Sequence, residues 1–260
     1  MFFELQSKNA RMLDKFLGIV ESETVSMHFT PEGITLGLLK NDMSICANIK
    51  LDKNFFTTFT YNESMCNDTQ NVIIQKRRIV YHDEYNGSVT TARFCIPFIV
   101  FYKLDMKTCK AYFNEQHLNL HYEYNYEVTS TKTCGYIDGM NLELNYKFGS
   151  LIKIDLKLFK YLLTKFRSKF TNITISNDFM EWIVSNNKIK INLGTTINEK
   201  LLIKVSWLHL KKLFHFINYE VGYISISENN ELIKVIFQRN NVLIEVYLSN
   251  YSGNCANISE

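Results

Sequence analysis

The sequence is poor in residues that interrupt regular structure, and it lacks the common short catalytic motifs. Only two of its 260 residues are proline and ten are glycine, which leaves no long flexible linker. The phosphate-binding motif GxxxxGK[ST], the dinucleotide motif GxGxxG, the zinc-protease motif HExxH and the hydrolase motif GxSxG are all missing. Nothing in the sequence therefore argues for an enzyme.

Metal-ligand spacing, a secretory signal and a membrane span are also missing. The six cysteines form no CxxC pair, and several fall in strand-like runs, where a thiol is usually a small buried hydrophobe. No apolar run approaches the ~18 residues of a membrane-spanning helix. His117 and His121 stand four apart, which on a strand makes them neighbours on one face, more simply solvent-facing than a metal pair. We expect a reduced, intracellular protein with no metal, no cofactor and no membrane partner.

What the sequence does contain is a hydrophobic fraction of 46% and a net charge of +3. This hydrophobic content excludes a disordered chain, and the length allows two small domains or one large one. A charge of +3 neither requires nor excludes a nucleic-acid partner, so the distribution of charge has to decide.

Residues 150–176 are the most informative stretch, because they read as a strand, a capped helix and a second strand. Asp155 stands where an N-cap belongs. Apolar residues recur at helical spacing from Phe159 to Phe166 and form one face of the helix. The opposite face carries Lys157, Lys160, Thr164 and Lys165.

The same pattern of strand, helix and three strands occurs four times. From the first strand to the strand after the helix is 22 residues in the first and third units, 17 in the second and 21 in the fourth. Ser7 and Ser206 are predicted N-caps, and Pro97 is predicted to open a weaker helix over residues 96–104. The predicted strands are 2–5, 24–30, 34–38, 44–51, 91–95, 108–113, 117–124, 127–134, 151–154, 173–176, 180–184, 188–193, 201–205, 222–227, 232–238 and 242–248.

Two segments interrupt this pattern and divide the chain. Residues 63–90 read as an insertion carrying a hairpin, with an amphipathic strand over 72–81 and a turn signal at Asn86-Gly87. Residues 135–148 contain two glycines and read as a connector. We therefore predict an α+β protein of two domains, each with two βαβββ units. The N-terminal domain covers residues 1–134, the connector 135–148, the C-terminal domain 149–249 and a short tail 250–260.

Basic side chains recur on the predicted outward faces of these helices, where His209 and His215 are also expected to face solvent. If the helices lie side by side on one face of the sheets, they form one broad positive surface. Single Lys and Arg residues without clusters of base-reading side chains suit sequence-independent contact with phosphates. The candidate DNA-binding residues are Lys8, Arg11, Lys15, Lys103, Lys157, Lys160, Lys165, Lys211 and Lys212.

This arrangement resembles the DNA sliding clamps, the group of proliferating cell nuclear antigen. The segments that carry the likeness are FFELQSKNARMLDKFLGIV, VSMHFTPEGITLGLL, SICANIKLDKNFFTTF, LIKVSWLHLKKLFHFI and LIKVIFQRNNVLIEVYLSN. The double phenylalanine Phe55-Phe56 and the insertion at 63–90 are more similar to subunits of the heterotrimeric DNA-damage checkpoint clamp (nine-one-one).

The resemblance implies sheets on the outside, helices on the inner face around double-stranded DNA, and three subunits joined head to tail in a ring. It implies a non-catalytic, nuclear subunit that recruits a clamp loader and repair or checkpoint proteins. Edge strands near 127–134 and 188–193 would pair between subunits. Partners would dock in an apolar groove at the connector, on Tyr136, Ile137, Met140, Leu142 and Leu144.

Three other interpretations stay open at this point. The chain could form a replicative homotrimeric clamp that acts as a polymerase processivity factor. It could be a replication or transcription factor that has the clamp fold but forms no ring. It could also be an unrelated enzyme or structural α+β protein whose basic helix faces are merely solvated.

Overall fold

The computed structural model describes residues 1–62, 70–75, 78–83, 92–114, 117–138, 141–144, 146–216 and 218–251. The chain forms two compact units. Unit 1 comprises residues 1–41, 46–145 and 240–243, and unit 2 comprises residues 42–45, 146–239 and 244–260. No helix among the described residues is long and apolar enough to cross a membrane.

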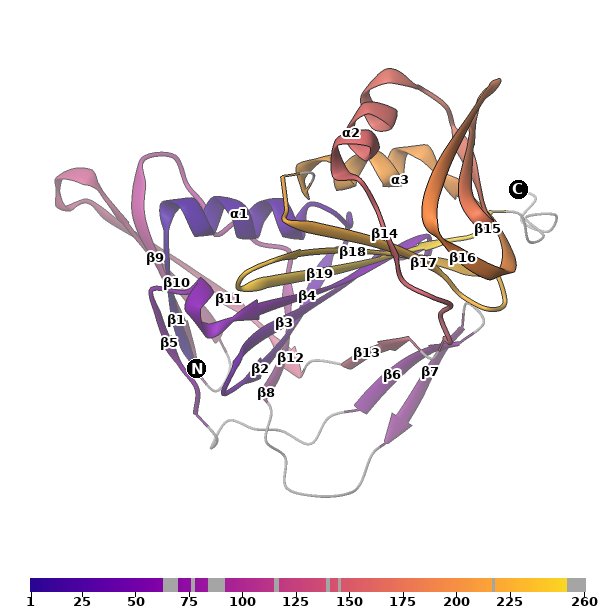
Figure 1. The fold of residues 1–260 in the computed structure, drawn as a ribbon. Coiled ribbons are helices and arrows are strands. Elements are labelled where there is room, and N and C mark those ends of the chain that lie inside the picture. The colour runs from indigo at the N-terminus through magenta and orange to yellow at the C-terminus, as the bar shows by residue number, and fades with distance from the viewer. Residues whose placement is uncertain are drawn as a thin grey trace, which may run out of the picture. The chain divides into compact units, whose positions relative to one another are not determined.

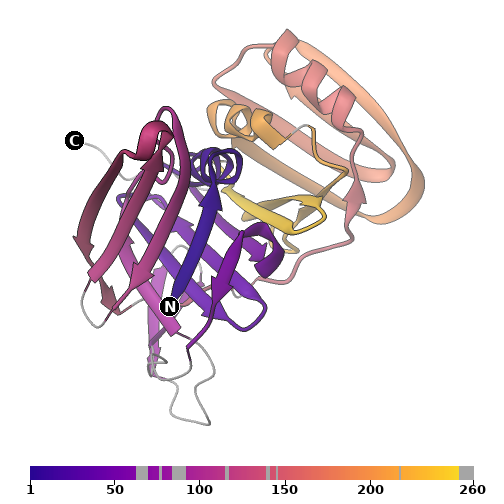
Figure 2. The ribbon, with the colours of Figure 1, turned by 90° about the vertical axis from the view of Figure 1, so that its left-hand side faces the viewer.

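Unit 1 is built mainly from two antiparallel sheets (Figure 1). The first has the strand order β11-β10-β9-β1-β5, from Thr129–Gly135, His117–Tyr124, Met106–Phe113, Phe2–Gln6 and Thr58–Thr60 (Figure 2). The second contains β12-β8-β2-β3-β4, from Ile137–Asp138, Ala92–Pro97, Thr24–Thr30, Gly33–Leu39 and Ile45–Asp52. Helix α1, Ser7–Leu17, packs against β1 and β9.

Aromatic side chains from both sheets form the core of unit 1. Apolar and polar residues alternate along β1 and β2, so that every second side chain points to the same face. Phe3 and Phe29 are fully buried in this way, and their ring centroids lie 6.3 Å apart. Phe113 lies 5.1 Å from Phe29 and 4.8 Å from Phe94, so the cluster joins four strands, β1, β2, β8 and β9.

A turn at residues 31 and 32 joins β2 to β3, and it depends on a glycine. Gly33 has a φ of 151°, which side chains rarely adopt. A Cβ there would lie 2.1 Å from the carbonyl oxygen of Leu51. The backbones of β3 and β4 therefore meet at this point only because the residue has no side chain.

The helix predicted over residues 96–104 is wrong. Strand β8 continues through Pro97, and residues 98–103 form no regular element. Exposure alternates here: Ile99 and Phe101 are buried, whereas Phe98 and Val100 are 43% and 47% exposed. A period of two is that of extended chain, and the continuous apolar run concealed it in the sequence.

The insertion contains a hairpin, as predicted. β6, Gln70–Gln75, pairs antiparallel with β7, Arg78–Asp83, within the stretch that the sequence suggested was one strand. β13, Asn141–Leu144, adds to β6 in parallel, so the connector itself contributes a strand to this small sheet. The turn predicted at Asn86-Gly87 lies outside the described residues.

Unit 2 contains two long strands, β15 (Phe170–Val184) and β16 (Asn187–Ser206). The hydroxyl of Thr171 donates to the carbonyl of Ile183 at 3.0 Å, although a straight strand would hold residues 12 apart at about 40 Å. β15 therefore folds back on itself. Residues 170–175 pair with 201–206, and 179–184 pair with 187–192. The separate strands predicted here thus exist as halves of the two runs.

The remainder of unit 2 is a second group of strands and two helices. The strand order is β19-β18-β17-β14, from Val242–Ser249, Leu232–Arg239, Val221–Ile226 and Ile152–Lys153. Helices α2 (Leu156–Lys165) and α3 (Trp207–Lys212) lie on the same side of these strands (Figure 1). Phe159 of α2 packs against Trp182 and Phe237, with centroid distances of 5.9 and 6.3 Å.

Candidate nucleic-acid interface and subunit edges

The three basic residues predicted on α1 lie on its solvent face. Lys8, Arg11 and Lys15 are exposed, and the opposite face is buried. The prediction that Ser7 is the N-cap is wrong, because Ser7 is the first helical residue and Gln6 before it makes no capping bond through its side chain. Packing of the buried face therefore holds this helix in place more than capping does.

Arg11 is already engaged within unit 1. Its guanidinium carbon lies 4.5 Å from the ring centroid of Tyr102, and a guanidinium nitrogen donates to the Tyr102 hydroxyl. The planar guanidinium can stack on one face and still offer its remaining N–H groups to an acceptor. Lys8 and Lys15 are the other exposed cations of this face, and each carries a compact charge on a flexible stem.

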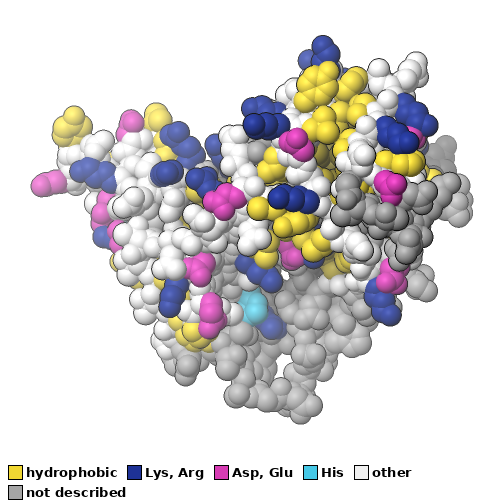
Figure 3. Space-filling model, viewed as in Figure 1, with side chains coloured by type: hydrophobic (Ala, Val, Ile, Leu, Met, Phe, Trp, Pro, Cys, Tyr) yellow, Lys and Arg dark blue, Asp and Glu magenta, His cyan; other side chains and the backbone are white. Residues whose placement is uncertain are grey.

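Helix α2 has a clearer cationic face than α1 or α3. Asp155 caps it as predicted, since one carboxylate oxygen accepts from the backbone N–H groups of Lys157 at 2.8 Å and Leu158 at 3.2 Å. Lys157, Lys160 and Lys165 are exposed. Figure 3 shows Lys and Arg side chains around a hydrophobic patch over the part of unit 2 that carries α2.

Helix α3 is shorter than predicted and presents a different face. Ser206 caps it, accepting from the N–H of His209 at 3.4 Å, but the α-helix ends at Lys212 and continues as a 3₁₀ helix over Leu213–Phe216. The prediction that His209 faces solvent is wrong: it is 5% exposed, whereas Leu208 is 63% exposed. Lys211 and Lys212 are half-buried, so their charges are less accessible than those of the exposed α2 lysines. The side chain of His215 lies outside the described part.

Lys103 does not lie on a helix, contrary to the prediction. Its amine lies 4.1 Å from the ring centroid of Tyr122, and the Tyr122 hydroxyl donates to the carbonyl of Val100 at 2.7 Å. Lys103 therefore helps to hold the extended segment over β10. Where the sequence predicted a weakly cationic helix, unit 1 instead exposes Phe98, Val100 and Leu104.

Asp14 explains why this segment is extended. Its two carboxylate oxygens accept from the backbone N–H groups of Phe101 at 2.8 Å and Tyr102 at 2.9 Å. Without Asp14, these two backbone N–H groups would need other hydrogen-bond acceptors, such as the carbonyl groups of a helix. Burial raises the pKa of Asp14 from its ordinary 3.8 to about 6, and the two backbone hydrogen bonds only partly oppose this.

The predicted docking residues of the connector do not all face solvent. Tyr136 is half-buried, with its ring 4.7 Å from Phe94 and 5.9 Å from Phe113, so it belongs partly to the core of unit 1. Ile137 is 68% exposed on the short strand β12. Leu144 is half-buried, while Met140 and the side chain of Leu142 lie outside the described part.

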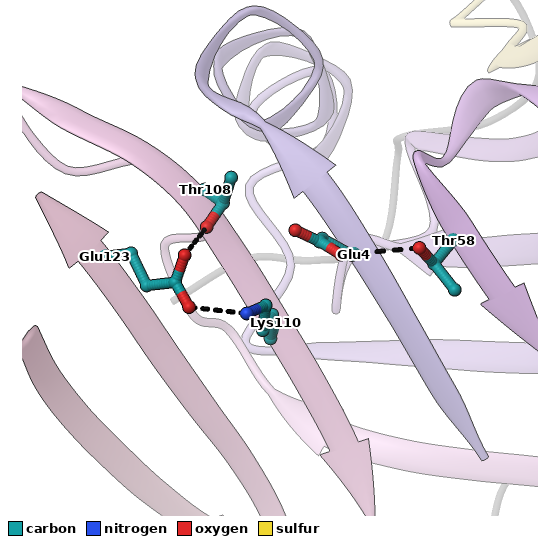
Figure 4. Close-up of polar contacts among 5 residues, drawn as sticks. All are labelled: Glu4, Thr58, Thr108, Lys110 and Glu123. Atoms are coloured by element: carbon teal, nitrogen blue, oxygen red, sulfur yellow. Dashed lines mark hydrogen bonds and ion pairs between the residues drawn. The ribbon is translucent and has the colours of Figure 1, made fainter.

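The outer face of the five-stranded sheet carries cross-strand polar contacts (Figure 4). Glu123 of β10 accepts from Lys110 and Thr108 of β9, and Thr58 of β5 donates to Glu4 of β1 at 3.3 Å. The hydrogen bond from Lys110 lowers the pKa of Glu123 and raises that of Lys110. These groups are partly exposed and paired with one another, which is typical of a sheet surface and not of an acid–base site.

β11 and β16 are among the end strands of the sheets, and each has an edge that no other described strand covers. β11 lies at one end of the five-stranded sheet, and residues 187–191 of β16 pair only with β15. An uncovered edge presents unpaired backbone N–H and C=O groups to solvent, which makes it a template for another strand. Both edges fall where the sequence predicted pairing between subunits.

No other chemistry stands out in the described residues. They contain no group of three or more His, Cys, Asp or Glu residues that could hold a metal ion. Cys46 and Cys109 are buried free thiols, and burial raises the pKa of each to about 12. Such thiols stay protonated and serve as packing groups.

Comparison with known proteins identifies the fold. No family model matches the chain, and no curated protein matches it in sequence. Its structure is similar to a chain of the PCNA2–PCNA3 complex from Sulfolobus tokodaii, with a TM-score of 0.64 over 96% of this chain and 99% of that one, at 10% identity. The chain therefore has the fold of a PCNA subunit over nearly its whole length.

Proposed function

We propose that this chain is a non-catalytic subunit of a ring that encircles duplex DNA and tethers partner proteins to it. The observation that carries the proposal is the match of nearly the whole chain to a clamp subunit from a complex of two clamp proteins. A shared fold does not by itself fix a function. Cationic helix faces and uncovered strand edges support the proposal independently of the fold.

The DNA contacts would come mainly from α1 and α2. Lys8, Arg11 and Lys15 form one exposed set, and Lys157, Lys160 and Lys165 form the other. Lone lysines on helices reach phosphates without reading bases, so the ring could slide. We assign a smaller part to Lys211 and Lys212, which are half-buried, and a structural part to Lys103.

Salt dependence of DNA association tests this assignment. Replacing Lys157, Lys160 and Lys165 by Ala in the assembled ring should lower the slope of log K against log salt by up to about 2.7, at about 0.9 per phosphate contact. A control with three other exposed lysines, Lys50, Lys53 and Lys107, replaced by Ala removes the same charge elsewhere. Equal slopes for the two variants would mean that α2 does not face DNA.

We further propose a role in damage signalling and repair, from the likeness of Phe55-Phe56 and the insertion at 63–90 to checkpoint-clamp subunits. Cells that lack the chain should then be sensitive to DNA-damaging agents while unperturbed DNA synthesis continues. A block to bulk synthesis in undamaged cells would instead indicate a replicative clamp.

A further inference from the structure

Tyr161 is an exposed aromatic side chain in the middle of the cationic face of α2. It is 52% exposed, and within α2, all of which the structure describes, it is the only large apolar side chain on the solvent side. Lys157 stands four residues before it and Lys165 four residues after it, the spacing that places side chains on one helix face. Lys160 is exposed beside them. An aromatic ring is therefore interleaved with three ammonium groups.

The ring of Tyr161 is held in place, but no cation covers it. Phe166 packs against the ring, with centroids 6.3 Å apart and planes at 86°. By contrast, the Tyr102 ring in unit 1 has the Arg11 guanidinium carbon 4.5 Å from its centroid. Within the part of the chain that the structure describes, no Lys or Arg lies over Tyr161 in this way. The ring therefore presents free aromatic surface to solvent among positive charges.

The other polar side chains around this face are already used within the helix. Asp155 is the only acid between residues 151 and 165, and it serves as the N-cap of α2. The Thr164 hydroxyl donates to the carbonyl oxygens of Lys160 at 2.9 Å and Tyr161 at 3.1 Å. The face therefore offers a ligand positive charge and one aromatic ring, with no competing carboxylate on its exposed side.

Unpaired bases joined by phosphates match these two features together. In a duplex the bases are stacked on one another, so lysines can reach the phosphates but a side-chain ring finds no free base face. In a single strand the base faces are free, and proteins that bind single strands combine cations along the backbone with aromatic side chains on which bases stack. An acidic peptide would match the charge but would leave the ring without a role.

We propose that Tyr161, Lys157 and Lys165 form a binding site for single-stranded DNA. An unpaired base stacks on the Tyr161 ring, and the phosphates on either side of it contact the two lysines. These lysines bracket the ring, since they lie about 12 Å apart along the helix at 1.5 Å per residue. The site adds unpaired DNA to the duplex contacts of the proposed function, on which it rests for the placement of α2 toward DNA.

Binding of a labelled oligo-dT strand of about 16 nucleotides, measured by fluorescence anisotropy beside a duplex of the same length, tests the site. Tyr161→Ala in the full chain should weaken oligo-dT binding by about five- to a hundredfold, the loss expected for one stacked base, and should leave duplex binding unchanged. Tyr161→Phe keeps the ring and should bind oligo-dT like wild type. Tyr126→Ala is the matched control, because it removes a tyrosine that is 94% exposed in unit 1, and it should change neither affinity.

Equal losses of oligo-dT and duplex binding in Tyr161→Ala would overturn the proposal, as would an unchanged oligo-dT affinity or no oligo-dT binding by the wild type. Photocross-linking gives a second readout, because an oligo-dT strand that carries iodouracil should cross-link to Tyr161. Cross-links confined to other residues would also overturn the proposal.

Failure of the proposed function would look different. A complex that leaves circular DNA as readily as linear DNA would refute the ring, while a Tyr161-dependent affinity for oligo-dT would still establish the single-strand site.

Discussion

Asp14 allows a quantitative test of how the extended segment after β8 is held. The carboxylate accepts from the amides of Phe101 and Tyr102, and its pKa is raised from 3.8 to about 6 by burial. Between these two values the folded chain binds a proton that the unfolded chain has released. Stability must therefore fall as pH rises through this window, because the ionised form is penalised in the folded state.

The magnitude follows from the shift. Two pKa units correspond to about 3 kcal/mol at 1.36 kcal/mol per unit, and partial exposure reduces this to about 2 kcal/mol. Asp14→Asn removes the ionisation but keeps one acceptor for the two amides. The stability of wild type relative to Asp14→Asn should therefore decline by about 2 kcal/mol between pH 4 and pH 7.

Urea unfolding of both proteins at four or more pH values measures this difference. Glu32→Gln, which removes an exposed carboxylate, gives the baseline for a surface acid. Asp14→Ala should be less stable than wild type by about 2–4 kcal/mol even at pH 4, because both amides lose their acceptor. Parallel stability curves for wild type and Asp14→Asn, or a relative gain for wild type with rising pH, would refute the reasoning.

Two further predictions use matched pairs of substitutions. Gly33→Ala should destabilise unit 1 by about 2–4 kcal/mol in thermal unfolding, because the new Cβ would lie 2.1 Å from the carbonyl oxygen of Leu51. Gly135→Ala should have little effect, because no atom lies within 4 Å of a Cβ there. Asp155→Ala should destabilise unit 2 by about 1 kcal/mol, because it removes the N-cap of α2. Gln6→Ala removes no capping bond and should not change stability. An equal loss in both variants would show that the Asp155 cap contributes nothing.

The strands and the two capped helices of unit 2 could be predicted because their signals are local. Asp155 and Ser206 precede apolar residues at helical spacing, and a cap acts within three residues of itself. Alternation along β2 and the turn at Gly33 are equally local. The PCNA-like fold followed from the order and spacing of these signals, although no single segment was specific.

The errors arose where distant residues decide the local structure. The amides of residues 101 and 102 bond to Asp14, 87 and 88 positions away, so the sequence around Pro97 could not reveal an extended segment. His209 lies within α3 and is buried with its neighbours Trp207 and Leu210, so this short helix buries a wider face than the apolar spacing indicated. The uncovered edges could be named from the resemblance. The cavity between α2 and the strands β15 and β16, whose lining runs from Lys153 to Leu193, becomes visible only in three dimensions.

Topological retention on DNA tests the central proposal most directly. The native complex containing this chain would be loaded on a closed circular duplex and washed at high salt, which screens phosphate contacts but does not open a ring. We predict that the complex stays on the circle and is released when a single cut linearises the DNA. Release at the same rate from circular and linear DNA would contradict the proposal that the chain forms part of an encircling clamp.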